Sequence, residues 1–397
     1  MKKQYSIRKF FNDLHLWLGI GSGLVLFIVC LSGTVYTFRT EIEEMAEPEK
    51  YHAHVPADAR PLKPELLVQQ LEKELKGKVV SLSIPENKAS TYQVGIRQEG
   101  KPAGAQGGGH GGGGRPKTYL VDPYTGVVKG STDSPTSEFF TTVMKLHRWL
   151  LIEGDTGRII VGISTIIFTF LLLSGLVLWF PAKLKNWKQN LKVKTNANWK
   201  RINHDLHNTL GFYAFLLLLI MSLTGLCWSF EWYKEGVSSV MGAEVFKGRG
   251  EKPLPSDPAQ AGTTTLTLTD FIQKANTELP YEGDVRVSFP ADSAGSYLVA
   301  KNKTGFFALA ASDKIQLNQY TGEVLKAEIF ADKPFNEQVV TLIRPLHLGD
   351  VFGTFSKILY FITCLIATTL PVTGTFIWIN KLKKRNKKKA KAKLAVS

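Results

Sequence analysis

Four stretches of the chain contain no charged residue and are almost entirely apolar. They cover residues 16–38, 159–180, 208–230 and 358–379, and each is 22 or 23 residues long. About 20 consecutive apolar residues are enough for an α-helix to cross the hydrocarbon core of a bilayer. The pattern therefore predicts four transmembrane helices, and it argues against a purely soluble enzyme, a disordered chain and a nucleic-acid-binding protein.

Two long polar segments separate the first span from the second and the third from the fourth. Each has the alternation of a small α+β module. In the first, Leu66, Leu67, Leu71 and Leu75 are expected to form one face of a helix. The predicted strands that follow it cover 79–84, 91–96 and 118–121. In the second segment a helix is predicted over 268–279, with strands over 285–289, 297–300, 306–310 and 315–317.

The positive charge is concentrated in three short flanks of the spans. Residues 1–15, 181–207 and 380–397 together carry +18, whereas the two long segments together carry −3 of the total of +15. Short loops rich in Lys and Arg stay in the cytoplasm. We therefore expect both termini to be cytoplasmic and both modules to face outward.

These patterns predict the following order of segments. It is a cytoplasmic N-terminus (1–15), helix (16–38), outward module (39–134), interfacial helix (135–158), helix (159–180), cytoplasmic basic loop (181–207), helix (208–230), second module (231–334), interfacial helix (335–357), helix (358–379) and cytoplasmic tail (380–397).

The chain also repeats itself. Asp13-Leu14-His15 recurs as Asp205-Leu206-His207 at an offset of 192 residues, and Leu146-His147 recurs as Leu346-His347 at an offset of 200. Both copies have the same orientation, which predicts a pseudo-two-fold axis along the membrane normal. The predicted fold class is thus a four-helix transmembrane bundle built from two tandem repeats, with two α+β outward modules.

The repeated histidines are the candidates for chemistry. If the axis relates the repeats, His15 meets His207 at one depth and His147 meets His347 at another. Two facing imidazoles are the axial ligands of b-type haem. The three cysteines all lie inside spans and form no C-x-x-C-H motif, so covalent haem attachment is not predicted. The alternative is that a duplication copied neutral interfacial histidines.

Several further residues have two interpretations. Arg148 directly follows His147, and Arg344 lies three residues before His347. Each arginine is either a haem-propionate partner or an ordinary interfacial arginine. The Ser/Thr-Gly pairs at 32–33, 174–175, 224–225 and 373–374 permit close helix packing, or leave room for a flat macrocycle. His204 lies one turn before His207, but its repeat equivalent is Asn12, so we expect it beside the site and not as a ligand. For His52, His54 and His110 we expect exposure to solvent.

The chain resembles a known family at these same residues. The segments Leu14-His15-Leu16-Trp17-Leu18-Gly19 and Leu146-His147-Arg148-Trp149-Leu150 are similar to the PepSY-associated transmembrane family of bacterial inner-membrane proteins. The segments Tyr124-Thr125-Gly126 and Tyr320-Thr321-Gly322 resemble those of PepSY domains, which are periplasmic. Some members are similar to siderophore or ferric-chelate reductases with two haems between their helices, whereas others are linked to peptidase inhibition.

The resemblance and the residues together predict a di-haem electron-transfer protein that reduces ferric chelates in the periplasm. The expected cofactors are two haem b groups per chain, one held by His15 and His207 and one by His147 and His347. No flavin or nicotinamide motif is present, so the electron donor is expected to be a quinol or a separate flavoprotein. The alternative function is a non-catalytic membrane protein that binds or regulates periplasmic peptidases, or senses a ligand.

Overall fold

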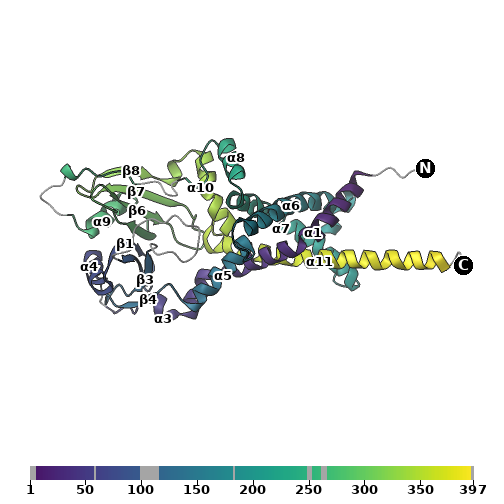
Figure 1. Cartoon of the computed structure of the whole chain (residues 1–397), viewed down its shortest axis with the longest axis horizontal. Coiled ribbons are helices and arrows are strands. Elements are labelled where there is room, and N and C mark those ends of the chain that lie inside the picture. Colours follow the sequence, from purple (N-terminus) through teal and green to yellow (C-terminus); the bar gives the residue numbers. More distant parts are fainter. Residues whose placement is uncertain are drawn as a thin grey trace.

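The computed structural model describes residues 6–57, 60–98, 116–181, 184–247, 253–260 and 266–394. It consists of a bundle of long helices with a β-sheet at one end (Figure 1). The first helix begins, and the last helix ends, on the side of the bundle away from the sheet. His110, with the rest of its glycine-rich segment, lies outside the described residues.

Four helices are long and apolar enough to cross a membrane. They are α1 (Ile7–Tyr36), α6 (Asp155–Trp179), α7 (Trp199–Ser229) and α11 (Gly353–Leu394). The helices α1 and α7 each pack against both α6 and α11, so they occupy opposite corners of the bundle. Small and branched side chains, among them Leu172, Ala214 and Ala367, form the central contact.

Two of these helices begin well before the apolar stretches that predicted them. The helix α1 starts nine residues before residue 16, and α7 starts nine residues before residue 208. At each start a capping side chain, Ser6 or Asn198, accepts a hydrogen bond from the backbone N–H three residues later. His15 and His207 therefore lie inside continuous helices. The predicted tail is also helical as far as Leu394.

The strands form one antiparallel sheet in the order β4-β3-β2-β1-β5-β6-β7-β8. Their bounds are β1 (Gly77–Ile84), β2 (Tyr92–Gln98), β3 (Lys117–Val121), β4 (Val128–Ser131), β5 (Asp284–Ser288), β6 (Ser296–Asn302), β7 (Ser312–Asn318) and β8 (Val324–Glu328). The sequence predicts two separate modules, but β1 pairs with β5 and joins the two halves into one sheet. The helices α4 (Pro64–Leu75) and α9 (Leu268–Glu278) cover one face, above a shared apolar core.

The strand predicted over 306–310 is wrong. These residues form the loop between β6 and β7, and they pair with the start of α11 instead of with another strand. The Ala310 N–H donates to Val351 O at 3.0 Å, and the Phe355 N–H donates to Phe306 O at 3.0 Å. The loop therefore ties the sheet to the beginning of the fourth long helix.

Short helices connect the sheet to the bundle. They are α2 (Arg39–Ala46), α3 (Pro48–Tyr51), α5 (Pro135–Trp149), α8 (Glu231–Met241) and α10 (Phe335–Leu348). The helices α5 and α10 occupy the positions of the predicted interfacial helices, but they end earlier than residues 158 and 357. Each ends where the next residue, Leu150 or Gly349, adopts a positive φ and caps the helix in the left-handed conformation.

Candidate functional site

The structure brings the four Leu-His histidines together as two pairs. The ring centroids of His15 and His207 are 6.3 Å apart, and those of His147 and His347 are also 6.3 Å apart. Each pair joins one residue from the first half of the chain with one from the second. The partners are about 200 residues apart in sequence.

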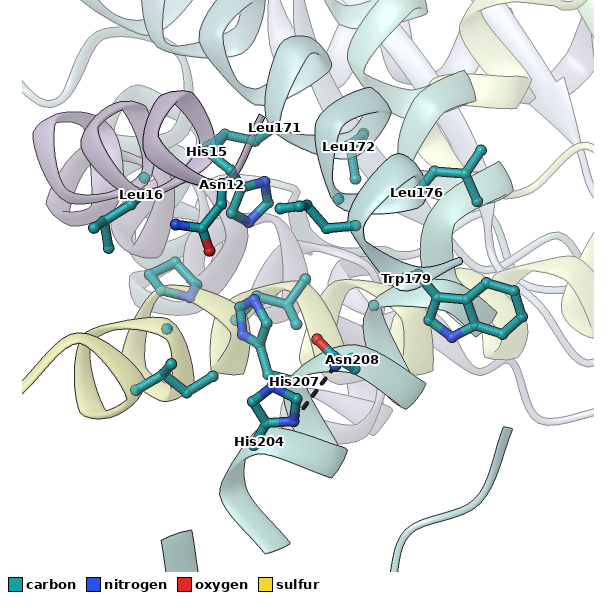
Figure 2. Close-up of a pocket in the computed structure, with 18 of the residues that line it drawn as sticks. Asn12, His15, Leu16, Leu171, Leu172, Leu176, Trp179, His204, His207 and Asn208 are labelled. Carbon is teal, nitrogen blue, oxygen red and sulfur yellow. Dashed lines mark hydrogen bonds between the residues drawn. The ribbon is translucent and has the colours of Figure 1, made fainter. Parts of the chain in front are cut away.

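The inner pair, His15 and His207, is held by the two helices that carry neither residue. His15 projects from α1, and its Nδ1 is 2.9 Å from Ser174 Oγ on α6. His207 projects from α7, and its Nδ1 is 2.9 Å from Thr373 Oγ1 on α11. Figure 2 shows the two rings on opposite sides of a cavity between the helices.

The outer pair consists of His147 on α5 and His347 on α10. Each of these rings is also held by a helix other than its own. His147 Nδ1 is 2.9 Å from Val29 O and 3.3 Å from Ser32 Oγ, both on α1. His347 Nδ1 is 3.0 Å from Met221 O and 3.3 Å from Thr224 Oγ1, both on α7. The second half of the chain therefore repeats the contacts of the first.

These hydrogen bonds define the tautomer of all four rings. A carbonyl oxygen can only accept, so Nδ1 of each outer histidine carries the proton. The inner hydroxyl groups already donate to backbone carbonyls, Ser174 to Leu171 O and Thr373 to Thr369 O, so they too accept from Nδ1. Every Nε2 is consequently left as the unprotonated nitrogen, which is the form that ligates a metal.

Burial also favours the neutral imidazole at the outer pair. It lowers the pKa of His147, and together with the neighbouring His147 it lowers the pKa of His347 to about 4. Both rings are therefore uncharged at neutral pH and available as ligands.

A glycine lies against each histidine ring. A Cβ atom at Gly33 or Gly175 would be 3.2 Å from the Cε1 of His147 or His15 respectively. At Gly374 the corresponding distance, to His207, would be 3.3 Å, and at Gly225 the distance to His347 would be 2.8 Å. The glycine of each Ser/Thr-Gly pair thus leaves the space that the ring occupies, while the hydroxyl group beside it accepts the ring's hydrogen bond.

A cavity of about 560 Å³ surrounds the inner pair. Glycines from two helices, Gly19 and Gly211, widen it, and apolar side chains of α6 form much of its wall. Polar side chains also line it, namely Arg8, Asn12, His204, Asn208 and Lys381. The volume is within the usual range for a cofactor or drug-sized ligand.

The spacing of each pair can be set against the spacing of two axial imidazoles of haem b. A metal–imidazole bond of about 2.0 Å and about 1.1 Å from nitrogen to ring centroid place two opposed rings about 6.2 Å apart. Both pairs match this spacing. Within the described residues there is no group of three or more His, Cys, Asp or Glu side chains able to hold a metal ion. The spacing of both pairs is compatible with haem, and the cavity around His15 and His207 offers space for a macrocycle.

The other predicted site residues are less closely associated with the pairs. Arg148 lies over the ring of Trp149, with its Cζ 4.5 Å from the ring centroid. Arg344 is on α10, one turn before His347, and its side chain is exposed. His204 lines the inner cavity with its repeat equivalent Asn12. In Figure 2 it points toward Asn208. His52 and His54 are exposed.

Sequence reasoning missed the way in which the Ser/Thr-Gly pairs hold the histidines. It interpreted these pairs as close helix contacts or as room for a macrocycle. The signal that could have identified their role is positional, since these four pairs correspond between the two halves of the chain at offsets of 192 and 199, as the four histidines do at 192 and 200. The structure also places the Trp228 ring 5.1 Å from that of His347.

The sequence profile of a family described as the PepSY-associated TM region matches residues 13–381, nearly the whole chain. The chain belongs to the PepSY-associated transmembrane family. The matched region of this family member includes both histidine pairs and the whole sheet. A search among curated proteins finds no match. Family membership and the four apolar helices together make the chain a multi-pass membrane protein.

Proposed function

We propose that this protein is a di-haem electron-transfer protein of the bacterial inner membrane that reduces ferric chelates in the periplasm for iron uptake. The observation that supports it most is the pair of opposed imidazoles at each of two depths, with every Nδ1 donating a hydrogen bond. A purely structural role would require neither the matched 6.3 Å spacing nor a free Nε2 on all four rings.

The two pairs are too far apart to share one iron. The outer ring of His147 contacts Val29 and Gly33 on α1, which also carries His15. The 14 residues from His15 to Val29 span about 21 Å along the helix. We therefore assign one haem b to His15 and His207 and a second to His147 and His347.

The orientation follows from charge. We place both termini and the basic loop 181–207 in the cytoplasm, and the sheet in the periplasm, because basic flanks remain on the cytoplasmic side. The sheet lies at the end of the bundle opposite to the chain ends (Figure 1). We interpret the two halves as a tandem repeat, since their histidines, ring contacts and strands correspond one to one.

Bis-imidazole haem, when bound, supplies iron that accepts and donates one electron. The chain's own residues would hold this group in place. The histidines would bind the iron, the Ser/Thr hydroxyls and backbone carbonyls orient the imidazole rings, and the apolar helices exclude water. A quinol or reduced flavoprotein would supply the electrons, and each quinol would release two electrons and two protons and so reduce two Fe(III) chelates to Fe(II). Outward electron transfer would gain about 2.3 kcal/mol per 100 mV of membrane potential, inside negative.

The test is spectroscopic. In the protein purified in detergent after expression with added haem precursor, we expect a reduced-minus-oxidised b-type α-band and two haems per chain. His15→Ala or His207→Ala should remove one haem, and His147→Ala or His347→Ala the other. An absent α-band would overturn the proposal in favour of a non-catalytic protein that binds periplasmic peptidases. Loss of both haems from a folded single variant would overturn the pairing.

A further inference from the structure

The sheet has one face covered by α4 and α9, and an opposite face that α3 contacts at β3 and β4. Side chains such as Val79, Val94 and Val287 point toward α4 and α9 and are buried. Their strand neighbours alternate to the opposite face. On that face the cross-strand register pairs Lys78 with Arg97. Further along it, the register places Arg286 and Lys314 on either side of Ala300.

This face carries cations that lack carboxylate partners. Within the described residues, Lys78, Arg97 and Arg286 form no ion pair, and Arg97 Nε is buried without a hydrogen-bond partner. The carboxylates on the same face are occupied elsewhere. Asp284 accepts from the Glu86 N–H, and Glu328 pairs with Lys326 and Lys333. Positive charge is therefore left on the central strands β1, β2 and β5.

Two contacts tie the sheet that carries this face to the bundle. In Figure 1, α4 and α9 lie at the end of the molecule away from the long helices. The connecting helix α3, which follows α1 and α2, packs against β3 and β4, with the Lys50 side chain close to Gly130. The loop 306–310 ties the other half of the sheet to the start of α11. The sheet that carries these cations is thus held at the end of the bundle where α5 and α10 carry His147 and His347.

Small polar residues occupy the middle of the same face. Ser81 and Ser288 lie opposite each other at the junction of β1 and β5, and Ser83 lies opposite Arg286. Short polar side chains flanked by longer cationic ones offer hydrogen-bond donors across this part of the sheet. Arginine binds carboxylates with two parallel hydrogen bonds, so this composition suits a ligand that carries several carboxylates.

We infer that this face, defined by Lys78, Arg97 and Arg286, binds the substrate, and that the substrate is an anionic ferric chelate of the citrate type. This inference rests on the proposed reductase function, because the chelate would be the substrate whose Fe(III) that function reduces. The binding step itself breaks no bond and transfers no electron. The cations attract and hold the chelate's carboxylates.

The test uses a chelate that cannot be reduced. Gallium(III) citrate has the charge of its ferric counterpart, so its binding to the full-length protein in detergent reports recognition without electron transfer. We expect Arg97→Gln and Arg286→Gln each to weaken this binding about tenfold, with stronger weakening in the double variant and at high salt. Lys73→Gln is the matched control, because Lys73 is an exposed cation on α4, on the covered side of the sheet.

The outcomes separate the two proposals. Equal binding of gallium citrate by the wild type and the folded double variant, equal weakening by Lys73→Gln, or equal affinity for a neutral gallium trihydroxamate would overturn the assignment of this face. If charge-dependent binding is present but the α-band is absent, the reductase proposal fails while the anion site stands. If the α-band is present and charge-dependent binding is absent, the anion site fails while the reductase proposal stands.

Discussion

At the scale of single residues, each candidate ligand depends on groups from a helix other than its own. His15 is the clearest case, because its Nδ1 bonds to Ser174 and its Cε1 lies against Gly175. A hydrogen bond at Nδ1 increases the electron donation of the imidazole to its metal. The hydroxyl groups should therefore tune the haem potential without acting as ligands.

Removing these hydroxyl groups provides a test. We expect Ser174→Ala and Thr373→Val to retain both haems and to raise the midpoint potential of the inner haem. A lost hydrogen bond of about 1 kcal/mol corresponds to about 40 mV for a one-electron couple. Potentiometric titration of the α-band would measure this shift. Thr375→Val is the control, because Thr375 donates to Pro371 O and bonds to no histidine. A potential unchanged, or lowered, in both site variants would contradict the argument.

His204 tests whether repeat symmetry assigns ligands correctly. It lines the inner cavity, but its Nδ1 is 3.5 Å from the Asn208 amide nitrogen and 3.7 Å from an Asp205 oxygen, and its side chain is 48% exposed. We therefore expect His204→Ala to retain both haems, whereas His207→Ala loses the inner one. Haem content and low-spin spectra of the two variants would decide. Retention by His207→Ala together with loss in His204→Ala would reverse the assignment.

At the scale of secondary-structure elements, several glycines in the long helices allow a neighbouring side chain to pack closely against the helix. Glycine inside a helix costs roughly 0.5–1 kcal/mol relative to alanine, so alanine would be preferred if helix propensity alone mattered. Gly225 in α7 is different because His347 packs directly on it. Gly21 in α1 has no heavy atom within 4 Å of its hypothetical Cβ. The two positions therefore form a matched pair.

We expect Gly225→Ala to lose the outer haem and to retain the inner one. The added Cβ would be 2.8 Å from the Cε1 of His347, so the ring must move away from Met221 O and Thr224 Oγ1. Gly21→Ala should bind both haems and be equally or more stable. Haem quantification and thermal unfolding of both variants would check this. Equal haem content in the two variants would show that the ring has room to adjust.

At the scale of the whole molecule, the two halves are joined twice, once in the bundle and once in the sheet. In the bundle the halves meet at the histidine pairs, and in the sheet they meet where β1 pairs with β5. Ion pairing adds a further link, because Lys357 at the start of α11 bonds to both carboxylate oxygens of Glu41 on α2. These contacts hold the sheet over one end of the bundle.

The sidedness of this arrangement can be measured by chemical labelling. We expect Lys88→Cys, in the turn after β1, to react with a membrane-impermeant maleimide in intact spheroplasts. Lys200→Cys, near the start of α7, should react only after the membrane is permeabilised. Both lysines are exposed, whereas the native Cys30, Cys227 and Cys364 lie within long helices. Labelling of Lys200→Cys alone in intact cells would invert the proposed topology.

The sequence predicted those helices and strands whose pattern of apolar residues lies within the element itself. The apolar stretches predicted α1, α6, α7 and α11 because a membrane span must be apolar over its own length, whatever surrounds it. Alternation predicted most strands, but at 306–310 it failed because hydrogen bonds to α11 replaced those of a strand partner. The ends of α1 and α7 were missed because polar, capped turns extend a helix beyond its apolar part.

The recurring spacing of the histidines was sufficient to predict which residues would be candidates, and the sequence by itself determined the four apolar spans. Only the tertiary structure decided that β1 pairs with β5, because an unpaired strand edge presents the same N–H and C=O groups to any partner. It also decided which hydroxyl and carbonyl hold each ring. Those contacts join helices more than 110 residues apart, and their geometry depends on how the helices pack.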